Sequence, residues 1–211
     1  VLDDQNGARE EGSGGFALMN QIIRDGRRQS MARSYLYPVL SRKNVTLLVN
    51  THVDRLTFAG NRATGVEIAS ASGPRRVQAR SEVILCSGGI NTPKLLMLSG
   101  IGDEAQLRSH GIKTLVHAPE VGQNFQDHLL HGGCSRDPKE HIPHRHRAAN
   151  AAGFVKSQAS FDSPDVNLVQ IELPYASDVV GKRYAPPNTS WALCAGLVAP
   201  KSRGELRLKS A

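Results

Sequence analysis

The residue types best suited to holding a ligand stand together at Ser87-Gly88-Gly89. An apolar run, 83–86, precedes them, and the Thr92-Pro93 step opens an apolar helical pattern after them. Glycine has no Cβ, so its backbone can come close to a ligand, and the first N–H groups of a helix favour anions. The segment therefore predicts a strand, a glycine turn and a helix start that together hold a ligand against the main chain. An ordinary strand-to-helix turn is the alternative.

Histidines form the second group whose spacing suggests chemistry. His141, His144 and His146 follow the pattern H-x-x-H-x-H, and His131 stands nearby. Arginines neighbour these histidines and would repel a cation, and no cysteine stands beside them. We therefore predict no metal site, and we interpret residues 131–150 as an exposed, irregular segment.

The elements that must position the glycine turn begin with a β-rich stretch. Four strand-like runs follow Asn44, at 45–50, 52–59, 62–69 and 75–81, and turn residues separate the last three. They predict an antiparallel meander. The nearly all-apolar run that leads to Ser87 predicts instead a strand that is covered on both faces. Asp103 is expected to cap a short helix over 104–109, and the apolar runs 166–173, 190–199 and 205–208 predict a second, antiparallel sheet.

Composition narrows the classes of protein. The chain has 211 residues and a formal net charge of +7, but its basic residues are scattered, so we predict no nucleic-acid partner. No run is apolar enough for a transmembrane helix. Three widely spaced cysteines favour a reducing compartment, and we expect a cytoplasmic protein. Both ends are interpreted as cuts through an ordered protein, so the rest of a parent chain is an expected partner.

Four segments resemble, in order, signatures of the glucose–methanol–choline (GMC) family of flavin oxidoreductases. The most specific is EVILCSGGINTPKLLMLSGIG at 82–102, which matches small residues, Ser/Thr-Pro, two apolar residues and Ser-Gly-apolar-Gly. The others are GRRQS with ARSYL within 26–36, VGQNFQDH at 121–128 and PKSRGEL at 200–206. Because all four occur in the family's order, the resemblance covers most of the chain.

The resemblance implies a mixed α/β fold, with part of an FAD-binding Rossmann-like domain that carries a β-meander and part of an antiparallel-sheet substrate domain. We expect residues 1–40 to form a connecting, substrate-domain segment, 41–128 to belong to the FAD-binding domain and 129–211 to the substrate domain. The family's Gly-x-Gly-x-x-Gly fingerprint and its C-terminal catalytic histidine have no match in the chain, and we expect both to lie outside it. No catalytic residue is therefore assigned.

The resemblance also implies FAD as the cofactor. The backbone around Ser87 would pass the nucleotide half of FAD, the backbone of Val53 would meet the adenine ring, and the loop 121–128 would lie near the flavin. For that loop, hydrogen bonds within its own turn are the alternative to cofactor contact. The predicted cofactor-binding residues are Val53, Ser87, Gly88, Gly89, Asn124, Asp127 and His128.

The activity that the resemblance implies is oxidation of the CH–OH group of a small alcohol to an aldehyde, with oxygen or a quinone as electron acceptor. Choline-like, pyridoxine-like and other primary alcohols are admissible substrates. Asn150 stands where choline-oxidising relatives hold a carboxylate, which weakens the case for choline. Two alternatives stay open: an FAD-containing enzyme similar to hydroxynitrile lyases, without net redox chemistry, and a basic binding module without a cofactor. The piece alone is expected to be inactive.

Overall fold

The computed structural model describes residues 14–70, 73–136 and 149–211. The chain forms two compact units. Val1–Ser34 with Asp127–Lys201 make one, which we call the sheet unit, and Tyr35–Gln126 with Ser202–Ala211 make the other, the meander unit. Within the described ranges, no helix has the length and hydropathy that a membrane span requires.

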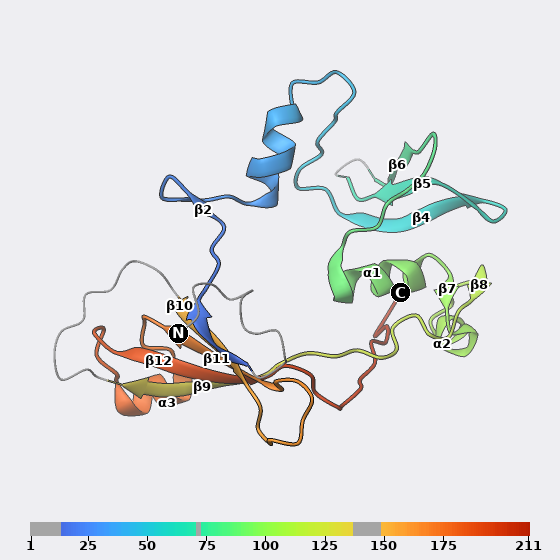
Figure 1. Cartoon of the computed structure of the whole chain (residues 1–211). Helices are drawn as coiled ribbons and strands as arrows, with labels where there is room; N and C mark the ends of the chain where they lie inside the picture. The colour runs from blue at the N-terminus through green and yellow to red at the C-terminus, as the bar shows by residue number, and fades with distance from the viewer. Residues whose placement is uncertain (1–13, 71–72, 137–148) are drawn as a thin grey trace. The chain divides into compact units, whose positions relative to one another are not determined.

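The sheet unit is built on a five-stranded antiparallel sheet with the strand order β1-β10-β11-β12-β9 (Figure 1). Side chains of a strand alternate between the two faces of a sheet, and β12 follows this rule because Ala192 and Cys194 are buried while Leu193 between them is exposed. The antiparallel sheet predicted from the later apolar runs is thereby confirmed. The strands are β1 Gly15–Leu18, β9 Leu129–Arg136, β10 Ala149–Val155, β11 Val166–Ile171 and β12 Trp191–Leu197.

An aromatic ring covers a glycine at one edge of this sheet. Phe16 of β1 stands opposite Gly153 of β10. A Cβ built on Gly153 would lie 2.5 Å from Cδ1 of Phe16, so the ring occupies the space that a side chain would need. The ring of Phe16 can therefore pack on β10 only because residue 153 is a glycine.

Two local sets of hydrogen bonds stabilise loops and ends of elements in the sheet unit. The carboxylate of Asp165 accepts hydrogen bonds from the backbone N–H of Ser157 at 2.7 Å and from its hydroxyl at 2.6 Å. These bonds, the hydroxyl's first, lower the pKa of Asp165 from its usual value. The helix α3, Asp178–Tyr184, begins after Ser177, whose hydroxyl accepts from the N–H of Val180.

The meander unit contains the three-stranded sheet that the alternating runs predicted. Its strands are β4 Val53–Ala59, β5 Arg62–Ile68 and β6 Arg75–Gln78, paired antiparallel in that order. The helix α1, Gly88–Leu98, packs against β4 (Figure 1). Buried apolar side chains from the strands, α1 and the next helix form the core of this unit: Leu56, Ile68, Leu95, Met97 and Leu107.

Short elements follow α1. The strands β7, Ile101–Gly102, and β8, Val116–His117, pair with each other in parallel. The helix α2, Glu104–Ser109, lies between them in the sequence. Asp103 caps α2 as predicted, because its Oδ1 accepts from the N–H of Gln106 at 2.8 Å. Farther on, Gly122 lies against the tail of the chain: its carbonyl accepts from the N–H of Leu206 at 2.7 Å.

Between β1 and β4 the elements are short. The strands β2, Ile23–Arg24, and β3, Arg27–Arg28, form a small hairpin. A π-helical turn, Ala32–Leu36, and a 3-10 turn, Tyr37–Val39, follow it. Near the start of the π-helical turn, the hydroxyl of Ser30 accepts from the N–H of Arg33 at 3.2 Å.

The prediction of a covered strand before Ser87 was wrong. Residues 83–86 form no strand, and the side chain of Ile84 is 74% exposed. The run 45–50 is also not a strand. Both runs are apolar enough for a sheet, but a strand exists only where a neighbour pairs with it, and no described segment pairs with either run.

Three smaller predictions also need correction. The run 205–208 is not a strand; instead Gly204 forms one antiparallel bridge with Phe125. The segment 131–150, expected to be irregular, overlaps β9 and β10 at its two ends. Its glycines and histidines weaken the strand pattern there, but both ends pair with neighbouring strands. His141, His144 and His146 lie outside the described residues. The helix expected to open at Thr92-Pro93 begins at Gly88, with Pro93 inside it.

Candidate cofactor-binding site

A hollow of about 250 Å³ lies between the start of β4 and one face of α1. The residues before and in β4 contribute Thr51, His52 and Val53. Since positions three, four and seven apart share a helix face, one stripe of α1 lines the opposite wall. That stripe consists of Asn91, Lys94, Leu95 and Leu98, with Ser87 at the helix start. The structure therefore brings two of the predicted cofactor residues, Val53 and Ser87, to the same hollow.

The start of α1 has the form expected for close contact with a ligand. Ser87 is the N-cap residue, but its hydroxyl makes no capping bond, so the first N–H groups of α1 are not served by it. Gly88 has φ of +83°, in the region that favours glycine. A Cβ at Gly88 or Gly89 would meet nothing within 4 Å, so the protein's own packing does not require glycine at position 89. The open space beside this backbone fits a group that approaches from outside the chain.

A serine hydroxyl links α1 to β4. The Oγ of Ser99, directly after α1, accepts from the N–H of Leu56 at 2.9 Å and donates to the carbonyl of Leu95 at 2.6 Å. Leu56 lies in β4 and is 7% exposed, so water has little access to replace this bond. Ser99 therefore links α1 to β4, the two elements whose neighbouring residues line the hollow.

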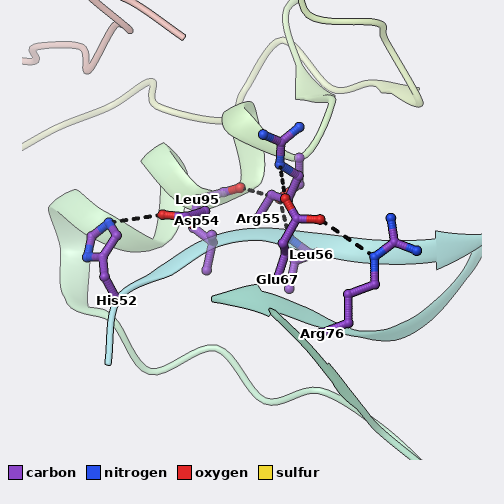
Figure 2. Close-up of polar contacts among 8 residues, drawn as sticks. His52, Asp54, Arg55, Leu56, Glu67, Arg76 and Leu95 are labelled. Carbon is purple, nitrogen blue, oxygen red and sulfur yellow. Dashed lines mark hydrogen bonds and ion pairs between the residues drawn. The ribbon is translucent and has the colours of Figure 1, made fainter. Parts of the chain in front are cut away.

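Charged side chains on the meander are paired with one another. Glu67 of β5 is 16% exposed at its side chain and lies between two arginines, 3.2 Å from Nε of Arg55 and 3.6 Å from Nε of Arg76 (Figure 2). His52 and Asp54 approach more loosely, with Nε2 and Oδ1 4.0 Å apart. Glu67 thus pairs with two arginines of the sheet, and neither Glu67 nor Asp54 lines the hollow beside α1.

The other predicted cofactor residues make local contacts. Asn124 has φ of +61°, and its carbonyl accepts from Nε2 of Gln126 at 3.3 Å. The carboxylate of Asp127 accepts from the N–H of His128 at 2.8 Å, and Nδ1 of His128 lies 3.1 Å from the carbonyl oxygen of Leu197. Asn124 belongs to the meander unit, whereas Asp127 and His128 belong to the sheet unit. Their role in holding a cofactor stays a prediction.

Six residues that line the hollow were not among the predicted cofactor residues: Thr51, His52, Asn91, Lys94, Leu95 and Leu98. Asn91 and Lys94 follow Ser87 by four and seven positions, so helical spacing alone could have placed them on its face. His52 precedes Val53 and could have been included for the same wall. The signal was available once the helix start was set at Gly88 rather than at Pro93.

A larger hollow of about 810 Å³ lies elsewhere in the meander unit and contains none of the predicted cofactor residues. Polar side chains of α2, the turn at 119–123 and the tail line it. At its rim, Arg207 and then Gln123 lower the pKa of Glu205, because both bond its carboxylate. This arrangement is an exposed ion pair with a neighbouring amide, and it marks no reacting group.

Known proteins of one family resemble this chain. A family model described as GMC oxidoreductase matches residues 1–130. An uncharacterized GMC-type oxidoreductase of Mycobacterium tuberculosis is 39% identical over 216 residues, which are 93% of this chain and 40% of the relative. The oxygen-dependent choline dehydrogenase of Staphylococcus xylosus is 37% identical over 230 residues, 98% of this chain and 40% of the relative.

A solved structure agrees with these relatives. The pyridoxine 4-oxidase from Mesorbium loti has a TM-score of 0.80 and 30% identity, over 93% of this chain and 39% of that one. The chain belongs to the GMC oxidoreductase family. It spans about 40% of the length of the curated relatives that it matches. The predicted family and mixed α/β fold are confirmed, and with them the expectation that FAD is the cofactor of the family.

Proposed function

We propose that this chain supplies part of the cofactor site and part of the substrate domain of an FAD-dependent enzyme that oxidises a small primary alcohol to an aldehyde. The observation that carries the proposal is that Ser87, directly before the two glycines of α1, and Val53, at the start of β4, line one hollow. The choline and pyridoxine of the relatives' names are both small molecules with a primary alcohol group, which supports this class of substrate.

The chain's own residues would bind and orient the cofactor rather than carry out the reaction. Bound FAD would accept the hydride from the alcohol carbon. The bare backbone at Gly88 and Gly89 would lie against the nucleotide half, with the uncapped N–H groups of α1 favouring its negative charge. Val53 would offer backbone groups to the adenine ring. No histidine of this chain is proposed as the base.

The decisive experiment is anaerobic reduction of the flavin in the full-length protein. Flavin absorbance near its long-wavelength band is followed while primary alcohols, including choline and pyridoxine, are added one at a time. Bleaching by at least one alcohol, with the matching aldehyde formed, is the expected result. A flavin that no alcohol bleaches would favour the lyase-like alternative, and full-length protein without flavin absorbance would favour the basic binding module.

The electron acceptor is tested on the same preparation. The reduced enzyme is mixed with oxygen or with a soluble quinone, and the rate of flavin reoxidation is measured for each. Hydrogen peroxide formation with fast reoxidation by oxygen identifies an oxidase. Reoxidation by the quinone alone identifies a dehydrogenase.

A further inference from the structure

In the part of the chain that the structure describes, the hollow beside α1 is lined by two leucines and by one lysine without an ion-pair partner. Leu95 is buried and Leu98 is half-buried, and both lie on the same stripe of α1 as Asn91 and Lys94. Among the described residues, Lys94 forms no ion pair, and the residues that line the hollow include no carboxylate. A lysine without an acidic partner beside an apolar surface is suited to a ligand with a flat apolar part and a negative charge.

The two acids of the neighbouring strands have other partners. Asp54 of β4 approaches His52, and it lines a different hollow from the one that Lys94 lines. The carboxylate of Glu67 is occupied by two arginines. The positive charge of Lys94 is therefore available to a ligand in the hollow beside α1.

Helix geometry directs this charge toward the start of α1. Lys94 lies seven residues after Ser87, which is about 10 Å along a helix axis. Side chains on a helix lean toward its N-terminus, so the long stem of Lys94 extends over the turn that contains Asn91. The ammonium of Lys94 and the uncapped N–H groups at the start of α1 would then both attract a negative charge that lies beside the first turns of the helix.

The size of the hollow limits what enters it. A volume of about 250 Å³ is below the usual range for pockets that enclose a whole ligand, so only part of a dinucleotide would be held there. We propose that Lys94 is a charge-recognition residue of the cofactor site, whose ammonium pairs with a phosphate of the nucleotide half while Leu95 and Leu98 contact its apolar part. This inference rests on the proposed FAD site and assigns a residue to it that the family resemblance did not supply.

The test uses three variants of the full-length protein. Lys94→Met removes the charge and keeps the length of the stem, Lys94→Arg keeps the charge, and Lys43→Met is the control for the loss of one exposed positive charge elsewhere in the same unit. The dissociation constant for FAD is measured on apoprotein by fluorescence titration at low and high salt. We expect Lys94→Met to weaken FAD binding about tenfold at low salt, with less effect at high salt. Lys94→Arg and Lys43→Met should stay within about twofold of the unchanged protein.

ADP and adenosine, used as competitors of FAD, separate charge recognition from simple packing. Lys94→Met should weaken competition by ADP and leave competition by adenosine unchanged. Equal weakening of both competitors, or equal FAD binding by Lys94→Met and Lys43→Met, overturns the role of Lys94 and leaves the FAD site itself intact. An unchanged full-length protein that binds no FAD overturns the proposed function and this inference together.

Discussion

Replacing Ser99 by alanine tests whether one hydroxyl holds the two walls of the candidate site together. The substitution removes the acceptor for the N–H of Leu56. Leu56 lies in β4 and is only 7% exposed. The carbonyl of Leu95 keeps a second donor, the N–H of Ser99 at 3.1 Å, so its loss is small. The cost is therefore that of one buried, unpaired N–H, about 1–3 kcal/mol.

Hydrogen exchange measures this cost where it arises, because a protein of several domains has no single free energy of unfolding. In the full-length protein, protection of the amides in 53–59 should fall by about 5- to 150-fold in Ser99→Ala, the equivalent of about 1–3 kcal/mol. Ser109→Ala is the matched control: its hydroxyl donates to the carbonyl of Gln106 at 2.7 Å, but it is exposed and water can replace it. Equal protection in the two variants would refute the structural role of Ser99.

Three further predictions follow from the glycines and from one carboxylate. Gly89→Ala should leave the apoprotein at least as stable as before, since nothing lies within 4 Å of the new Cβ and alanine favours a helix, yet weaken FAD binding measured by titration; unchanged affinity would argue against backbone contact there. Gly122→Ala should lower the denaturation midpoint more than Gly111→Ala, because both have positive φ but only the Cβ at 122 would lie 2.5 Å from the carbonyl oxygen of Leu206. Ser157→Ala should raise the pKa of Asp165 toward its usual value, which carboxyl NMR titration measures. A carboxyl whose pKa is lowered by folding stabilises the fold above the unfolded-state pKa, and this stabilisation is lost as the pH falls through the folded-state pKa. The stability of the variant should therefore depend less on pH in the acid range.

Local patterns predicted the parts of the fold whose partners are close in the sequence. The runs 52–59 and 62–69 alternate and are joined by a short turn, so β4 and β5 pair without any distant segment. Asp103 caps α2 through its own side chain, which is also a local matter. Such features depend on neighbouring residues, and the sequence displays those directly.

The failures involve partners that no local pattern names. The run 83–86 has the apolarity of a covered strand, but apolarity does not state which segment will pair with it. β9 and β10 were hidden for the opposite reason, because glycine and histidine weaken the strand pattern while pairing with β12 and β11 overrides it.

For the candidate site as well, local patterns were predicted and contacts between distant segments were not. Val53 and Ser87 were predicted through the family resemblance, and the structure places both at one hollow. Helical spacing relates Lys94 to the face of Ser87, but only the structure shows that this face meets β4. That face is determined by contacts across more than thirty residues, such as the one between Ser99 and Leu56, separated by 43 positions.

The ring of Phe16 over Gly153 has a consequence for how this family can change. A larger residue at 153 would collide with the ring, and a smaller residue at 16 would leave the glycine bare, so neither position can drift freely while the other stays constant. Substitutions at the two sites should therefore occur as matched exchanges in homologues. A lineage that gains bulk at 153 is expected to have lost its aromatic residue at 16.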